Sequence, residues 1–205
     1  MVEVRRENDG LMSIKLVVGG FTMNIISVYA PQAFLDEKVY RYFWEYFDEM
    51  ASGIPHIEKL LIKGDFNGHI GVPSWWYDDA HGGFGFGDRN GGGTSLLNFA
   101  RAFDLVIANS IFSKKEEHVV TFQSSVAKTQ IDYLLYRKSD RCLCTYCKVI
   151  PSGNLMTIHR LLVIDIEITK KRRKRAVYGQ PRIKWAALTE DAWQKLRVKM
   201  LTIGS

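Results

Sequence analysis

The sequence has few cysteines, three in 205 residues, and they lie close together at Cys142, Cys144 and Cys147. An odd number at this spacing excludes the disulfide framework that stabilises many small secreted proteins. A zinc site would need a fourth ligand, and no histidine lies close to them in the sequence. We therefore interpret them as reduced thiols, with metal binding as the less favoured alternative.

The sequence also lacks a long apolar run. No stretch approaches the length needed to cross a bilayer. The first six residues mix apolar and charged side chains, and they contain no apolar run of the kind found in a secretory signal. We therefore expect a nuclear or cytoplasmic location and no membrane partner.

Acidic residues are outnumbered by basic ones, 22 to 28, which gives a net charge of +6. This excess suits a polyanionic partner such as nucleic acid. Much of it lies in one run, Lys170, Lys171, Arg172, Arg173, Lys174 and Arg175. The run is interpreted either as a solvated tail or as a nuclear-localisation or nucleic-acid-binding patch, and the two interpretations are compatible.

Apolar periodicity predicts alternating strands and helices. Two β-rich runs around Gly19 and Gly20 predict a hairpin, and helical spacing after Asp36 predicts a helix capped by that residue. The expected strands are residues 11–18, 21–29, 60–62, 105–108, 118–122, 130–136, 147–150 and 161–166, and the expected helices are 36–50, 94–103 and part of 185–201. This order indicates an α/β or α+β layered sandwich over residues 1–168, followed by a basic tail over 169–205.

The central motif is the turn at residues 64–68, Gly-Asp-Phe-Asn-Gly, directly after a buried strand. Side chains two residues apart on a strand point the same way, so Asp65 and Asn67 are expected to converge. A carboxylate can bind a hard cation or take a proton from water, and a carboxamide can donate to a phosphate oxygen. The alternative is an Asx turn that ends the strand.

Two further polar residues interrupt or precede apolar strands. Asp132 lies inside one, where an unpaired carboxylate is costly, and His159 lies directly before another. An Asp–His pair would hold the imidazole in one tautomer and raise its basicity. With Tyr29 at a strand end and Gln32 close behind it, these residues predict a cluster suited to phosphodiester hydrolysis.

At four places, in order, the chain resembles the endonuclease/exonuclease/phosphatase superfamily: residues 28–32, 64–68, 130–133 and 157–160. The resemblance covers about residues 10–168. More closely, it is similar to the endonuclease domain of non-LTR retrotransposons and to host proteins of the craniofacial development protein 2 type. It implies an α/β fold, a four-layer sandwich of two packed mixed sheets flanked by helices, and Mg²⁺-dependent hydrolysis of nucleic acid, DNA rather than RNA.

The resemblance also implies roles for individual residues. Asp65 would orient or deprotonate the attacking water, while Asn67 and Tyr29 would hold the phosphate. His159 would stabilise the pentacoordinate phosphorane, and Asp132 would orient His159. A phosphate-binding Asn of the family is replaced here by Gln32.

The sequence departs from the family in its metal ligands. The family begins with a strand, a helix and a strand that ends in a metal-binding Glu, and this sequence is expected to begin after them. Glu3 and Glu7 precede the first hairpin without a suitable strand, and Ile158 replaces a second metal ligand. We therefore expect an incomplete metal site near Asp65 and weak or absent activity. The alternatives are a non-catalytic remnant that binds nucleic acid or protein, and a phosphatase of the same fold.

Overall fold

The computed structural model describes residues 2–32, 36–72, 75–151, 158–167, 194, 195 and 197. The chain forms two compact units, Met1–Lys170 and Lys171–Ser205. In the second unit, the three described residues are helical and fall within the range expected for a terminal helix.

Among its described residues, the first unit contains ten strands, two α-helices and four short 3₁₀ helices. The strands are β1 (Val2–Arg6), β2 (Leu11–Val18), β3 (Phe21–Tyr29), β4 (Lys59–Asp65), β5 (Leu105–Ile107), β6 (Phe122–Gln123), β7 (Lys128–Thr129), β8 (Asp132–Arg137), β9 (Cys144–Ile150) and β10 (Leu161–Ile166). The helices are α1 (Glu37–Ser52), α2 (Gly91–Ala102), η1 (Trp75–Tyr77), η2 (Ala108–Ser110), η3 (Glu116–His118) and η4 (Lys138–Leu143).

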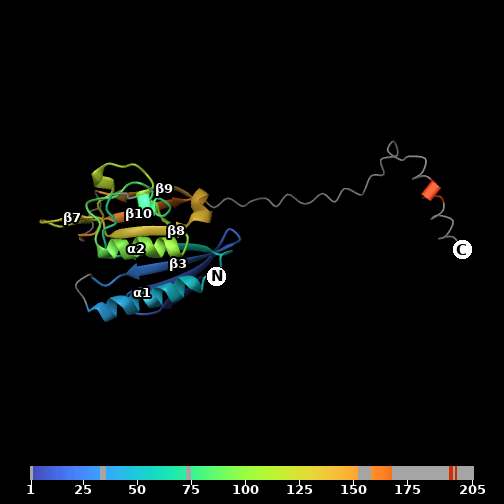
Figure 1. Ribbon diagram of the computed structural model, residues 1–205, viewed down its shortest axis with the longest axis horizontal. Helices are drawn as coiled ribbons and strands as arrows, with labels where there is room; N and C mark the ends of the chain where they lie inside the picture. The colour runs from blue at the N-terminus through green and yellow to red at the C-terminus, as the bar shows by residue number, and fades with distance from the viewer. Residues whose placement is uncertain are drawn as a thin grey trace. The chain divides into compact units, whose positions relative to one another are not determined.

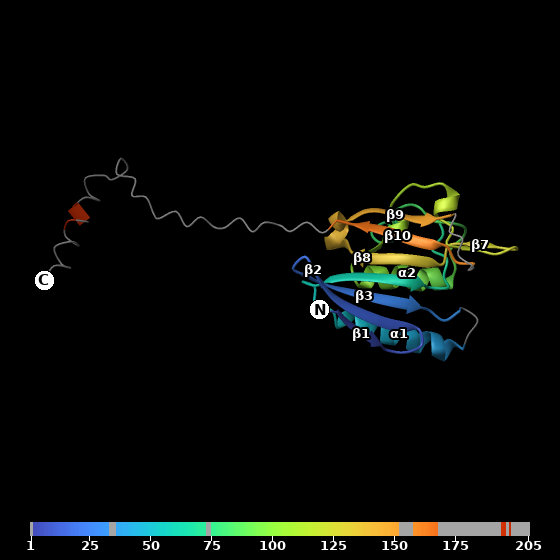
Figure 2. The same ribbon diagram turned by 180° about the vertical axis from the view of Figure 1, so that it is seen from behind.

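A mixed six-stranded sheet forms the centre of this unit, in the order β1-β2-β3-β4-β8-β5. Its strands β3 and β8 are labelled in Figure 1. Only β3 and β4 pair in parallel, and α1 connects them; the other neighbours in the sheet are antiparallel. The three N-terminal strands and α1 lie side by side in the reverse view (Figure 2). The mixed α/β class predicted from the sequence is therefore confirmed.

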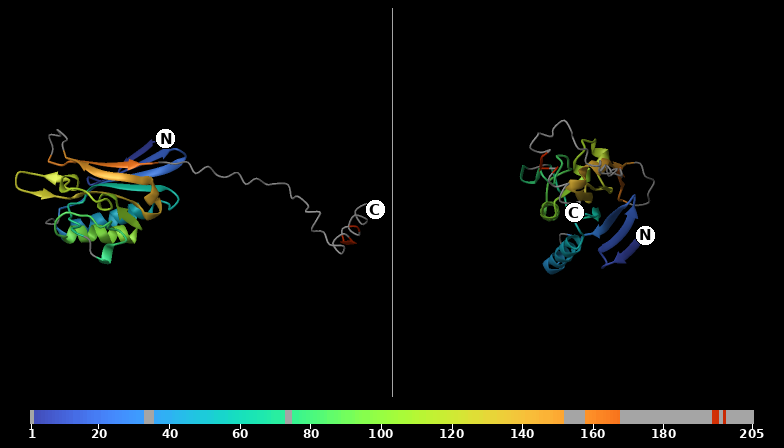
Figure 3. Two further views of the ribbon diagram at one scale, coloured as in Figure 1. Left: turned by 90° about the horizontal axis from the view of Figure 1, so that it is seen from above. Right: turned by 90° about the vertical axis from the view of Figure 1, so that its right-hand side faces the viewer.

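Helices cover one face of the central sheet and the β9–β10 pair covers the other, as the left view of Figure 3 shows. The second sheet is an antiparallel pair in the described part of the chain, where a larger mixed sheet was expected. One apolar cluster lies between the central sheet and the helices, and a second lies between the sheet and the β9–β10 pair. None of the described helices is long and apolar enough to span a bilayer.

The N-terminal hairpin forms as predicted, because Gly19 and Gly20 both adopt positive φ, at 60° and 87°. The absence of a strand before it was a wrong expectation. Residues 2–6 form β1, which pairs with β2 and places Glu3 within a strand. Its Val-Glu-Val sequence has the two-residue alternation of a strand, but all of its side chains are exposed. It therefore lacks the apolar run that marks a buried strand.

Two other expectations need correction. The helix expected over residues 94–103 begins three residues earlier, at Gly91, and Asn90 caps it by accepting the Gly93 amide at 2.9 Å. Residues 118–121 do not form a strand. His118 ends η3, and strand pairing begins only at Phe122, the first residue of β6. Val119 and Val120 are buried there without a ladder, which made the segment look like a core strand.

Phe47 lies at the centre of the apolar cluster beneath the helices. Its side chain is fully buried, and its ring stacks on that of Phe99 with 4.2 Å between centroids. We expect Phe47→Ala to lower the free energy of unfolding by about 3 to 5 kcal/mol, because it removes a large buried ring and leaves a cavity. Urea denaturation measures this change.

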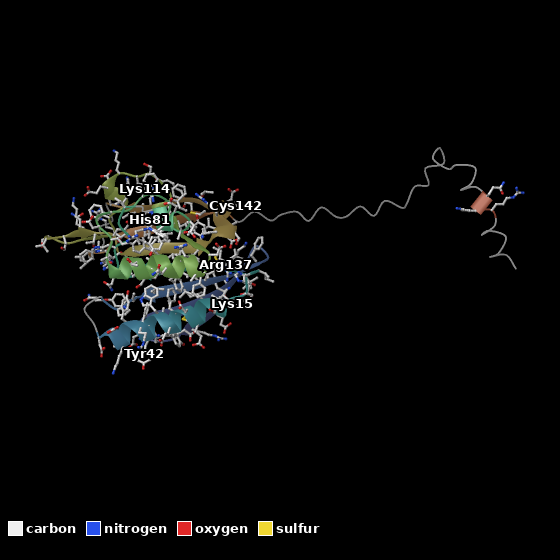
Figure 4. All side chains as sticks on the ribbon, viewed as in Figure 1. Lys15, Tyr42, His81, Lys114, Arg137 and Cys142 are labelled. Carbon is white, nitrogen blue, oxygen red and sulfur yellow. The ribbon has the colours of Figure 1, made fainter. Side chains whose placement is uncertain are left out.

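Tyr42 provides the matched control, since it lies on the same helix with 61% of its surface exposed (Figure 4). Tyr42→Ala is expected to change the free energy of unfolding by no more than about 0.5 kcal/mol. Equal losses in the two variants would contradict this assignment of the core.

Candidate functional site

Three polar side chains form one row at an edge of the central sheet. Tyr29 ends β3 and lies opposite Asp65, the last residue of β4, and Asp65 lies opposite Asp132, the first residue of β8. Residues paired in this way present their side chains on the same face of a sheet. The strand ends therefore bring together three residues that are far apart in the sequence.

The turn after β4 is an Asx turn. The Asn67 amide donates to Oδ1 of Asp65 at 2.8 Å, and Asn67 adopts a positive φ of 47°. Because the strand ends at Asp65, strand periodicity does not extend to Asn67, and the expected convergence by period two was the wrong argument. The Asn67 side chain instead donates to the Ala30 carbonyl at 2.7 Å, which joins the ends of β3 and β4.

His159 completes the cluster. Its Nδ1 lies 3.1 Å from Oδ2 of Asp132, and its Nε2 lies 4.0 Å from Oδ2 of Asp65. The imidazole also packs edge-on against Phe122, with 5.2 Å between ring centroids, and a β-bridge joins the two residues. The structure thus places the predicted Asp–His pair in contact and brings Asp65 beside it. We call Asp65, Asp132 and His159 the carboxylate–imidazole cluster.

Two buried residues that the sequence did not single out hold Asp132 in place. The Thr121 hydroxyl oxygen accepts the backbone amides of Ile131 and Asp132, each at 3.0 Å. The Asn109 side chain donates to the Asp132 carbonyl at 3.0 Å and accepts the Leu134 amide at 3.2 Å. Both are polar residues at the ends of apolar runs, and this is the signal that could have identified them.

Further polar contacts fix the loops around the cluster. The Tyr133 hydroxyl is buried and lies within hydrogen-bond distance of the Gly68 carbonyl, at 3.0 Å. Asn90, the cap of α2, also accepts the His69 amide at 2.9 Å. His81 (Figure 4) is buried under the following glycine-rich loop, with Nε2 3.1 Å from the Gly71 carbonyl. The loop after Asp65 is therefore held to the sheet by Tyr133, to α2 by its cap Asn90, and to the later part of the same loop by His81.

Burial changes the acidity of both carboxylates. Desolvation, together with the nearby Asp132 carboxylate, raises the pKa of Asp65 to about 6, against the lowering effects of the hydrogen bond from the Asn67 amide and of His159. Desolvation also raises the pKa of Asp132, although its hydrogen bonds with His159 and Thr121 act in the opposite direction. Asp65 is consequently poised to exchange a proton near neutral pH.

The cluster offers a cation two carboxylates and an imidazole, with donor atoms within 4.8 Å of one another. Mg²⁺ needs only one or two protein carboxylates when water and substrate phosphates supply the remaining oxygens. Within the described chain, Oδ2 of Asp65 accepts no hydrogen bond, whereas the Asp132 carboxylate is engaged by His159 and Thr121. The residues present therefore fit a Mg²⁺ ion held mainly through Asp65.

The remaining predicted residues differ in how closely they join the cluster. Tyr29 is 58% exposed beside Asp65, and Gln32 is exposed three residues later. Ile158 is 54% exposed and precedes His159 directly. The basic run at residues 170–175 lies outside the described residues.

The sequence matches no protein-family model. It is 30% identical over 168 residues to craniofacial development protein 2 from Tragulus javanicus and from Bos taurus, and each match covers 80% of this chain. The chain spans 29% and 28% of the lengths of these two curated relatives, which is less than a third.

The structure is similar to solved nuclease structures. The endonuclease domain of TRAS1, a telomere-specific non-LTR retrotransposon, has a TM-score of 0.57 at 15% identity and matches over 82% of this chain and 70% of that one. An AP endonuclease from Archaeoglobus fulgidus has a TM-score of 0.57 at 17% identity, with the same coverage. An endonuclease/exonuclease/phosphatase family protein from Leptotrichia buccalis C-1013-b has a TM-score of 0.50 at 16% identity, over 77% of this chain and 53% of that one. The resemblance inferred from the four sequence segments is confirmed at the level of fold.

The raised pKa of Asp65 predicts a pH-dependent stability difference. A carboxyl group whose folded-state pKa lies above its unfolded value of 3.8 stabilises the fold at low pH, and this stability is lost as pH rises through about 6. Asp65→Asn removes the charge and keeps an oxygen for the Asn67 amide. We expect little difference from wild type at pH 4 and a gain of up to about 3 kcal/mol in the free energy of unfolding at pH 8.

Urea denaturation at the two pH values measures this difference. Asp88→Asn is the control, because Asp88 is exposed in the loop before α2 and has no hydrogen bond or ion pair within the described chain. A gain for Asp65→Asn that is equal at both pH values would contradict a buried, destabilised carboxylate.

Proposed function

We propose that this chain, which has the fold of endonuclease/exonuclease/phosphatase structures, binds nucleic acid and slowly hydrolyses its phosphodiester bonds. The observation that carries the proposal is the position of His159 between two carboxylates, 3.1 Å from Asp132 and 4.0 Å from Asp65. DNA is the proposed nucleic acid, because the chain is similar in fold to the endonuclease domain of a telomere-specific retrotransposon.

In this proposal Asp132 positions the imidazole. The Asp132 carboxylate accepts a hydrogen bond from Nδ1–H of His159. Nε2 of His159 is therefore the ring nitrogen that faces Asp65 and the substrate. A protonated Nε2 donates to a nonbridging phosphate oxygen, where negative charge grows in the transition state. His159 thus stabilises the pentacoordinate phosphorane, and Asp132 stabilises the charged ring.

Asp65 is proposed to orient the attacking water. Its carboxyl group, with a pKa of about 6 in the metal-free chain, is largely ionised at pH 7 and above and can accept a hydrogen bond from that water. Tyr29 lies next to it in the sheet and offers an exposed hydroxyl for the phosphate. Asn67 uses one of its two side-chain N–H donors on the Ala30 carbonyl, which leaves the other for a phosphate oxygen.

We propose Mg²⁺ as the cofactor, held mainly by Asp65. When bound, it would polarise a phosphate oxygen as a Lewis acid. The proposal of slow hydrolysis follows from the ligand set, because one carboxylate with an unengaged oxygen is a weak hold on a cation that requires oxygen ligands.

The same ligand set favours a second candidate function, which is binding of nucleic acid without hydrolysis. Both functions require the phosphate-binding edge of the sheet, but only the first requires His159 and a metal ion. Measurements of hydrolysis and of binding on the same variants therefore separate them.

Nicking of supercoiled plasmid tests the catalytic proposal. We expect wild-type chain to convert supercoiled to open-circular DNA slowly in Mg²⁺, and His159→Ala to reduce that rate by about 10² to 10⁴-fold, since a group that stabilises transition-state charge is removed. Rates are read from the loss of the supercoiled band on agarose gels.

His118→Ala is the matched control, because His118 lies outside the cluster and contacts the Val149 carbonyl through Nδ1 at 3.0 Å. This variant is expected to retain the wild-type rate. If wild-type chain binds plasmid but neither Mg²⁺ nor Mn²⁺ supports nicking, the catalytic proposal is wrong and the binding function stands.

We further propose that the basic run at residues 170–175 contributes sequence-independent affinity. Replacing its six basic residues with glutamine is expected to weaken DNA binding and to flatten the dependence of log K on log salt, because fewer counterions are released. Fluorescence anisotropy at several KCl concentrations measures the slope. An unchanged slope would remove this run from the binding surface.

A further inference from the structure

A lysine lies on the same sheet face as the carboxylate–imidazole cluster. Lys63 precedes Asp65 by two residues on β4, so the two side chains emerge on the same face. Lys63 lies opposite Ser27 on β3 and Leu134 on β8, which makes this the next row behind Tyr29, Asp65 and Asp132. A rise of about 3.3 Å per residue places the Cα atoms of Lys63 and Asp65 about 7 Å apart.

This second row opens into a groove that is continuous with the cluster. The groove has a volume of about 270 Å³, and both Lys63 and the cluster residues Asp132 and His159 line it. Leu134 from the sheet and Leu161 and Leu162 from β10 form apolar walls. An ammonium group in a groove with such walls attracts an anion more strongly than one on an open surface.

Lys63 is not neutralised by a neighbouring acid. It is exposed and makes no ion pair or hydrogen bond within the described part of the chain. Arg160 also lines the groove, but its guanidinium donates to the Glu117 carbonyl at 3.2 Å and to the Gln123 side chain. The ammonium donors of Lys63 are therefore available to a ligand, whereas two of the guanidinium nitrogens of Arg160 already donate to the protein.

The spacing fits a nucleic-acid strand. Each strand of a duplex carries one negative charge per about 3.4 Å of helix axis, so a phosphate next to the reacting one lies within reach of a lysine about 7 Å away. We propose that Lys63 forms a phosphate-binding subsite, which takes the phosphate adjacent to the one held at the carboxylate–imidazole cluster. The inference rests on the proposed function, because it assumes a phosphodiester at the cluster.

Binding in EDTA tests the subsite without requiring hydrolysis. The full chain is titrated against a fluorescein-labelled single strand of about 12 nucleotides between about 50 and 200 mM KCl. Lys63→Met is expected to weaken binding and to reduce the slope of log K against log salt by about 0.7, the value for one phosphate contact on a single strand. Lys63→Arg, which keeps the charge, is expected to retain the slope.

Lys38→Met is the matched control, because Lys38 is exposed on α1 and its side chain makes no ion pair within the described residues. It removes the same charge at another site and is expected to leave the slope unchanged. A Lys63→Met variant that binds like Lys38→Met would overturn the subsite.

Two small competitors locate the contact. A thymidine dinucleotide with two phosphates is expected to lose affinity in Lys63→Met, whereas thymidine monophosphate is expected to bind wild type and variant equally, since its one phosphate occupies the cluster. An equal loss for both competitors would overturn the placement beside the reacting phosphate. Failure of the proposed function would appear separately, as wild-type chain that binds the strand in EDTA but does not nick plasmid in Mg²⁺.

Discussion

The pairing of β4 between β3 and β8 is the constraint on which the rest of the structure depends. Its register sets Asp65 opposite Tyr29 on one side and Asp132 on the other, and it sets Lys63 one row behind. The close approach of the strands requires glycine at position 64, because a Cβ there would collide with the backbone of Val28. A slip of one residue would turn every one of these side chains to the opposite face. The chemistry of the site is therefore fixed by backbone hydrogen bonds.

The carboxylate–imidazole cluster is costly to the fold. Two carboxylates are partly buried next to each other, and desolvation raises the pKa of both. Buried polar partners such as Thr121 and Asn109 limit this cost by satisfying the backbone around Asp132. Desolvated carboxylates of raised pKa beside an imidazole are typical of a binding or catalytic site.

Much of this arrangement could be predicted from the sequence, because polar residues at either end of an apolar run mark the strand ends of an α/β sheet. That rule placed Asp65, Asp132, His159 and Tyr29 together, and helical periodicity placed α1 with its Asp36 cap. It could not find β1, whose exposed residues carry little burial signal, or the role of Asn90, which caps a helix that starts among glycines. Lys63 was equally hidden, because its significance comes from cross-strand register and not from its neighbours in sequence.

The β9–β10 pair covers only part of the sheet face on which it lies. Within the described chain β10 pairs along one side only, with β9, and Val2 and Val4 of β1 are 67% and 59% exposed. Unpaired N–H and C=O groups at a strand edge can template the addition of another strand, particularly beside bare aliphatic side chains. The unpaired side of β10 is therefore one of the strand edges in the described chain, and a lysine or proline introduced there, outside the carboxylate–imidazole cluster, would act against strand addition at that edge.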